Sequence, residues 1–75
     1  MRQIIDGYLY DTENSELIHE EKDTKRRIFK TKHGNFFRAF RNGSISPMQE
    51  EDVKEYLGTK DIDKYIEIFG NPQEA

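Results

Sequence analysis

Two tight-turn signals constrain the fold of this chain most, because each reverses the backbone between short runs that contain apolar residues. The first is Asp6-Gly7, flanked by residues 4–5 and 8–10, and the second is His33-Gly34, flanked by residues 25–32 and 35–41. Such dipeptides are typical of β-hairpins, since glycine accepts the positive φ that the turn needs. The sequence therefore predicts two antiparallel hairpins.

The register is predicted for the first hairpin but left open for the second. A two-residue turn at Asp6-Gly7 pairs Ile5 with Tyr8 and Ile4 with Leu9, and it places Arg2 opposite Asp11. In the second hairpin, a two-residue loop would pair Phe29 with Arg38. A three-residue loop, residues 32–34, would instead pair Phe29 with Phe37.

The segment between the hairpins predicts a polar turn and one more strand. Residues 11–15 are Asp, Thr, Glu, Asn and Ser, whose side chains readily bond nearby backbone groups. Residues 16–21 hold Leu17 and Ile18 between charged flanks, which is typical of an edge strand.

Two helices are predicted near the end of the chain. Ser46 is suited to cap the first helix, with Pro47 at its first position, Gln49 at the capping-box position and Gly58 at its end. The second helix is expected from Ile62 to Phe69, capped by Asp61 and stopped by Gly70. Its apolar residues recur with helical spacing and are expected in the core: Ile62, Tyr65, Ile66 and Phe69.

Together these elements predict one α+β domain over residues 1–75. A small, mostly antiparallel sheet of two hairpins and a short strand occupies residues 1–41, two helices over residues 47–70 pack on one face, and residues 71–75 form a flexible tail. A core this small only just offsets chain entropy. Self-association would add buried area, which leaves a homodimer open.

Composition bears on location. The chain has no cysteine, and a small secreted domain usually needs disulfides, so a cytoplasmic location is expected. No apolar run approaches the ~20 residues of a membrane span, and residues 1–3 do not begin a signal peptide, so no membrane association is expected.

Charge is sorted by segment. Residues 25–41 hold seven of the twelve basic side chains and none of the fifteen acidic ones, whereas residues 1–24 and 42–75 are both strongly acidic. Such asymmetry bears on partners more than on fold. It defines two candidate surfaces, which we call the basic hairpin and the acidic face.

The basic hairpin carries seven cations: Lys25, Arg26, Arg27, Lys30, Lys32, Arg38 and Arg41. Four phenylalanines lie among them: Phe29, Phe36, Phe37 and Phe40. Exposed cations beside exposed rings would bind phosphates and stack on bases. Alternatively, the cations pair with the acidic strand 16–21 while the rings fill the core, and a pI near 5.3 favours this second interpretation.

The acidic face belongs to the helices: Glu50, Glu51, Asp52, Glu55, Asp61, Asp63 and Glu67. A negative helical surface can dock on a basic protein groove in place of phosphates. The alternative is a solvated helix face that aids solubility.

Nothing in the sequence predicts an enzyme, a metal site or a cofactor. His19 and His33 have no cysteine nearby, and the three serines lie in turn or cap contexts. Asp61-x-Asp63 resembles the start of a calcium loop but lacks the glycine and glutamate that should follow, so Asp61 is better explained as a helix cap.

Three segments in order resemble a family of small uncharacterised proteins carried by phages and conjugative elements of Gram-positive bacteria. They are residues 5–13 with the following Glu16-Leu17-Ile18, residues 29–37, and residues 63–70. The chain departs from that family in its basic run 25–27 and its short link 42–46. The resemblance implies a context, since compact acidic proteins of mobile elements often block a host factor, and anti-CRISPR proteins are similar in size and charge.

These observations together predict a non-enzymatic inhibitor of a nucleic-acid-handling host defence enzyme, such as a CRISPR effector nuclease, acting through charged surfaces. The alternative is a nucleic-acid-binding accessory or regulatory protein that uses the basic hairpin directly.

Overall fold

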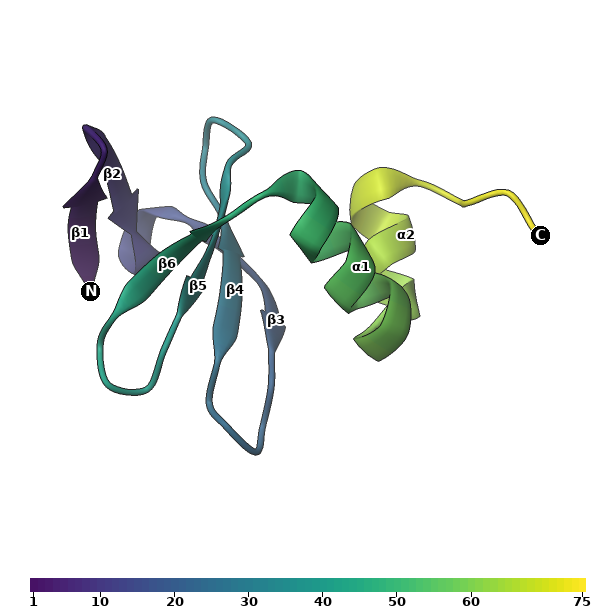
Figure 1. Ribbon diagram of the computed structural model, residues 1–75, viewed down its shortest axis with the longest axis horizontal. Coiled ribbons are helices and arrows are strands. Elements are labelled where there is room, and N and C mark those ends of the chain that lie inside the picture. Colours follow the sequence, from purple (N-terminus) through teal and green to yellow (C-terminus); the bar gives the residue numbers. More distant parts are fainter.

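The computed structural model describes all 75 residues as an α+β fold in three layers. A separate N-terminal hairpin, a four-stranded sheet and two helices follow one another along the longest dimension of the molecule (Figure 1). No helix has both the length and the apolar composition needed to cross a membrane.

The first hairpin has the predicted turn and register. Strands β1 (Arg2–Ile5) and β2 (Tyr8–Asp11) pair only with each other, with Ile5 opposite Tyr8, Ile4 opposite Leu9 and Arg2 opposite Asp11. Asp6 and Gly7 have φ values of 52° and 81°, as a type I′ turn requires. A 3₁₀ turn over Thr12–Asn14 follows, where the predicted polar turn lies.

The second sheet has the order β3-β4-β5-β6 and is antiparallel throughout. Its strands are β3 (Glu16–Glu20), β4 (Arg27–Lys30), β5 (Phe36–Ala39) and β6 (Ile45–Met48). Phe29 pairs with Phe37, and the Thr31 N–H donates to the Asn35 carbonyl at 2.7 Å. The loop is therefore the three-residue one, with Gly34 at φ 87°.

The prediction for residues 46–49 was wrong. Ser46 and Pro47 belong to strand β6, and helix α1 (Glu50–Lys60) begins after Gln49, which makes no side-chain cap hydrogen bond. Strand β6 lies at the edge of the sheet, where the missing N–H of proline costs no ladder bond. Pairing with β5 lets Ile45 enter the core, which outweighs the local capping signal. The predicted end at Gly58 was also wrong, because α1 continues to Lys60.

Helix α2 (Ile62–Phe69) has its predicted ends, but the face that packs against the core differs from the prediction. Gly70 follows it at φ 90°. Ile62 remains 59% exposed, whereas Ile68 packs against the core beside Tyr65 and Phe69. On a helix, residues 62, 65 and 69 lie on one side, but residue 68 extends the packed face in the direction away from residue 62, which is left at the rim. Packing against α1 thus rotated the helix relative to the position expected from spacing alone.

Alternation along the strands gives the sheet two apolar faces. The helix face contains one cluster: Ile18, Ile28, Phe36, Val53 and Leu57. The opposite face, which the hairpin covers, contains another: Phe29, Phe37, Ala39 and Ile45, with Ile5 and Tyr10 packed against them. The prediction of a single sheet with helices on one face therefore missed strand β6, and it did not place the first hairpin apart from the sheet as a cover for the other face.

Candidate interaction surfaces

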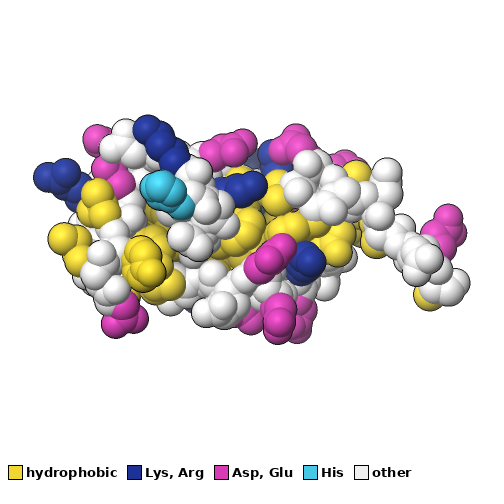
Figure 2. Space-filling model, turned by 90° about the horizontal axis from the view of Figure 1, so that it is seen from above, with side chains coloured by type: hydrophobic (Ala, Val, Ile, Leu, Met, Phe, Trp, Pro, Cys, Tyr) yellow, Lys and Arg dark blue, Asp and Glu magenta, His cyan; other side chains and the backbone are white.

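The outer side of α1 forms the free part of the acidic face. Glu51, Asp52 and Glu55 are exposed, and Glu55 follows Glu51 by four residues and Asp52 by three, so it neighbours both on the helix. No cation lies within 4.0 Å of their carboxylates, whereas Glu50 is 3.8 Å from the Lys54 amine. In Figure 2, acidic side chains lie over the helical part of the surface and also at the opposite end of the molecule.

A groove runs beside this acidic helix. It has a volume of about 430 Å³ and lies between α1 and the strands β5 and β6. Asp52 and Glu55 line one wall, and Arg38 lies on the other. Two free carboxylates at its rim make the groove suited to a lysine or arginine side chain of a partner.

The acidic residues of α2 are placed differently. Asp63 is exposed in the first helical turn, and Glu67 accepts a 2.7 Å ion pair from Lys64. Asp61 is engaged within the fold. One of its carboxylate oxygens caps α2 by accepting from the Lys64 N–H at 3.2 Å, and the other lies 3.1 Å from His19 Nδ1.

His19 and Asp61 belong to a polar cluster that joins the sheet to both helices. Tyr56 of α1 donates its hydroxyl proton to Glu21 at 2.5 Å, and its oxygen lies 3.4 Å from His19 Nε2. The His19 and Tyr56 rings meet edge to face at 5.3 Å. The cluster therefore ties the end of β3 to the helical layer.

The cluster shifts the pKa values of three groups. Burial, reinforced by the hydrogen bond to Glu21, raises the pKa of Tyr56 to about 12. Hydrogen bonds from Tyr56 and Thr24 lower the pKa of Glu21, and hydrogen bonds from His19 and the Lys64 N–H lower the pKa of Asp61. The folded state thus favours neutral Tyr56 and ionised Glu21 and Asp61.

In the basic hairpin, the rings do not form an exposed stacking platform. Phe29, Phe36 and Phe37 are buried, and Phe40 is half-buried. Four of the cations lie over rings, at distances of 5.3–6.0 Å: Arg26 over Phe40, Arg27 over Phe29, Lys30 over Phe36 and Arg38 over Tyr56. Lys25, Lys32 and Arg41 are exposed.

The strand cations also differ from the predicted pairing with the acidic strand. Lys30 lies opposite Glu16 and Arg27 opposite Glu20 in the ladder, but neither pair comes within 4.0 Å. Aromatic faces, rather than carboxylates, receive Arg27 and Lys30. Lys25 and Arg26 precede β4 instead of belonging to it.

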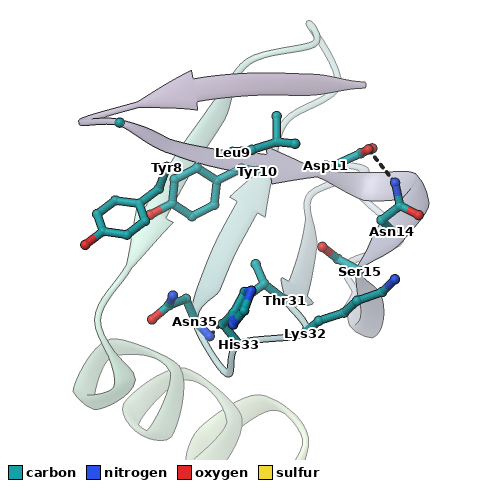
Figure 3. Close-up of a pocket in the computed structure, with 11 residues that line it drawn as sticks. Tyr8, Leu9, Tyr10, Asp11, Asn14, Ser15, Thr31, Lys32, His33 and Asn35 are labelled. Atoms are coloured by element: carbon teal, nitrogen blue, oxygen red, sulfur yellow. Dashed lines mark hydrogen bonds between the residues drawn. The ribbon is translucent and has the colours of Figure 1, made fainter.

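A cleft of about 570 Å³ lies between the first hairpin and the β4–β5 turn. Residues 7–11 form one wall, and Thr31, Lys32, His33 and Asn35 form the other (Figure 3). Asp11 is held at one end, where its carboxylate accepts from the Glu13 N–H at 3.0 Å and from the Asn14 amide at 2.8 Å. These bonds lower the pKa of Asp11.

Sequence reasoning missed both the polar cluster and the cleft. The cluster joins residues 35 to 42 positions apart, and no local pattern marks such a pairing. Its single local sign was the cap residue Asp61. The cleft arises because the first hairpin stands apart from the main sheet, which the sequence did not indicate. No group of three or more His, Asp or Glu side chains is placed to hold a metal ion.

Comparison with known proteins gives no relative: no family model, no curated protein and no solved structure matches the chain.

Proposed function

We propose that this chain is a non-enzymatic interaction protein whose acidic face occupies a basic, nucleic-acid-binding groove of another protein. The observation that carries the proposal is the trio Glu51, Asp52 and Glu55, exposed and adjacent on α1 without a cation of their own. Three unpaired carboxylates on one rigid helix present negative charge as a nucleic-acid backbone does, and they attract a basic partner surface.

The contrast with the basic hairpin supports this choice of surface. Three of its four phenylalanines are buried, so they cannot stack on bases, and four of its seven cations lie over aromatic rings of the same chain. Among the acidic residues of α1, only Glu50 has an ion-pair partner within the fold.

For the partner, we favour a host defence enzyme that handles nucleic acid, such as a CRISPR effector nuclease, blocked by a protein of a phage or other mobile element. This choice follows from the resemblance described above and from the charge of the acidic face. A groove that binds DNA or RNA carries the lysine and arginine side chains that Glu51, Asp52 and Glu55 would meet.

The test is retention of the partner from a lysate of a Gram-positive host by the immobilised protein at low salt. The triple variant E51K/D52K/E55K should lose the retained protein. The control E13K/D23K/E74K changes the net charge equally at exposed sites away from α1 and should keep it. Retention should also fall with salt, because the contact is electrostatic.

The retained protein then decides the mechanism. If it is a nuclease, the purified chain should displace labelled nucleic acid from it competitively, and the triple variant should not. The proposal fails if no nucleic-acid-binding protein is retained, or if the triple variant and the control behave alike. Direct, salt-dependent binding of oligonucleotides that is lost in R27A/K30A/R38A would support the hairpin alternative instead.

A further inference from the structure

The cleft beside the first hairpin carries an inference that is independent of the acidic face. Its upper wall is one edge of a strand: β2 lies between β1 and the cleft, and five consecutive residues, 7–11, line it (Figure 3). Strand β2 pairs with β1 on one side and with no strand on the other.

The hydrogen-bond pattern of the hairpin shows which backbone groups face this free edge. The Thr12 N–H donates to the Met1 carbonyl at 3.0 Å, and antiparallel pairs alternate between bonded and unbonded. Tyr8 and Tyr10 are therefore bonded to β1. The N–H and C=O of Leu9 and the N–H of Asp11 point away from β1 and find no partner in the chain.

The rest of the cleft is lined by groups that can contact the side chains of a bound ligand. The Tyr8 and Tyr10 rings extend over it from β2, while His33 and Asn35 lie on the turn below (Figure 3). Tyr10 is half-buried and packs edge to face on Phe37 at 5.4 Å, so its position is fixed. Lys32 is exposed and has no carboxylate within 4.0 Å.

The hollow continues past the end of β2. A second depression of about 610 Å³ shares Asn14, Ser15, Thr31 and Lys32 with the cleft, so the two adjoin. An extended ligand would fit this shape better than a compact one. Strand β2 itself offers an edge of about 13 Å for its four residues, at ~3.3 Å per residue.

We propose that this cleft binds an extended peptide segment of a partner protein, which adds to β2 as a third strand. Peptide N–H and C=O groups complement the free groups of Leu9 and Asp11, as in other cases of strand addition. An apolar or aromatic peptide side chain packs against Tyr8 and Tyr10, and an acidic one reaches Lys32. The two edges of the four-stranded sheet are less suited, because β6 contains Pro47 and β3 carries a bulge between Leu17 and His19.

The experiment uses the full chain and a pool of capped pentapeptides, with valine at the second and fourth positions and the other three randomised. Peptides retained by the protein should be enriched in an aromatic residue and in glutamate or aspartate. On binding, the Leu9 and Asp11 amide protons should exchange with solvent more slowly, because they become hydrogen-bonded.

A matched pair of proline variants tests whether the free edge of β2 takes part in binding. Leu9 and Ile4 face each other in an unbonded pair, so each directs its N–H to an opposite outer edge of the hairpin. L9P removes a donor from the cleft side, and I4P removes one from the far side, where proline is tolerated on an edge. L9P should weaken binding by about tenfold, and I4P should leave it unchanged.

Peptides that are N-methylated at alternate residues provide the same test with the unaltered protein, which guards against loss of the hairpin in L9P. Methylation of the N–H groups that face β2 should abolish binding, whereas methylation of the alternate N–H groups, which face away, should not. The inference is overturned if L9P and I4P bind equally well or if neither methylated series loses binding. E51K/D52K/E55K should bind peptide normally, which separates this site from the acidic face.

Discussion

The two faces of the four-stranded sheet are covered to different extents, and β5 shows the contrast within two residues. Phe36 points to the helix face, where it belongs to a cluster with Val53 and Leu57, both 0% exposed. Phe37 points to the other face, where Phe29 stacks on it at 5.2 Å and Tyr10 meets its edge. Both rings are buried, but helices cover Phe36 and the first hairpin covers Phe37.

On the helix face, two helices and the Tyr56 cluster close the core. On the hairpin face, two strands provide the cover, and Ile4, Tyr8 and Leu9 remain 54–71% exposed. The hairpin also keeps an unpaired strand edge. The difference teaches that both layers bury a core ring, but that the thinner layer retains the exposed groups that a binding partner would use.

The comparison is tested most strongly by F36A and F37A. Each removes a buried phenylalanine from one face, and each should lower the free energy of unfolding by about 3–5 kcal/mol. For a domain of this length the total is roughly 4–11 kcal/mol, so both variants should be close to unfolding. Urea titration followed by circular dichroism measures the cost. A cost below ~1 kcal/mol for F37A alone would mean that the hairpin face does not belong to the cooperative core.

The fold was predictable where a local signal and the tertiary structure agree. Asp6-Gly7 fixes a turn of defined geometry, and Asp61 and Gly70 bracket α2, so these elements needed no knowledge of the rest of the chain. The segment 46–49 shows the opposite case. A proline after a serine predicted a helix start, but pairing with β5 gained more than the local cap.

The surfaces were less predictable, for a related reason. Periodicity places Glu51 and Glu55 on the outside of a helix, but it does not show whether a cation lies nearby. Arg38 and Phe36 looked like members of a basic-aromatic platform, yet Phe36 faces the core and Arg38 lies over Tyr56, eighteen positions along the chain. Such contacts depend on how layers stack, and a single sequence does not encode that in any local pattern.

The Tyr56 cluster gives a test confined to the helix face. Y56F removes the hydroxyl that donates to the Glu21 carboxylate and should cost about 1–2 kcal/mol. Y8F is the control, because Tyr8 is 65% exposed and makes no side-chain hydrogen bond, and it should be neutral. A cost for Y8F equal to that for Y56F would contradict the assigned role of the cluster.

Alkaline pH supplies a second readout for the same pair. The pKa of Tyr56 is about 12 in the folded chain and about 10 when unfolded, so its contribution is complete below pH 10 and is lost as the pH rises towards 12. The unfolding free energy of the protein should fall over this interval more steeply than that of Y56F. Parallel curves would show that the folded state does not hold Tyr56 neutral.

Substitutions of two glycines, one in the turn below the cleft and one in the helical layer, should change stability by less. Gly34 has φ 87° in the turn below the cleft, so G34A should destabilise by about 1 kcal/mol although the space is open. Gly58 lies within α1, where an added Cβ would meet Tyr65 at 4.0 Å, an ordinary contact. G58A should therefore stabilise by about 0.5–1 kcal/mol. Thermal melting measures both, and a shift of the same sign in the two variants would contradict this assignment.

The smallest expected effect bears on the purpose of the acidic face. Glu55 lies one turn from Glu51 and beside Asp52, and such like-charged neighbours cost a few tenths of a kcal/mol each. E55K replaces the repulsion with an attraction and should stabilise by about 0.5 kcal/mol at low salt, less in 1 M salt, with E55Q in between. If the face serves only solubility, E55K should also leave partner retention intact. A more stable protein that no longer retains its partner would show that α1 keeps an electrostatic arrangement that folding alone disfavours, as a binding surface does.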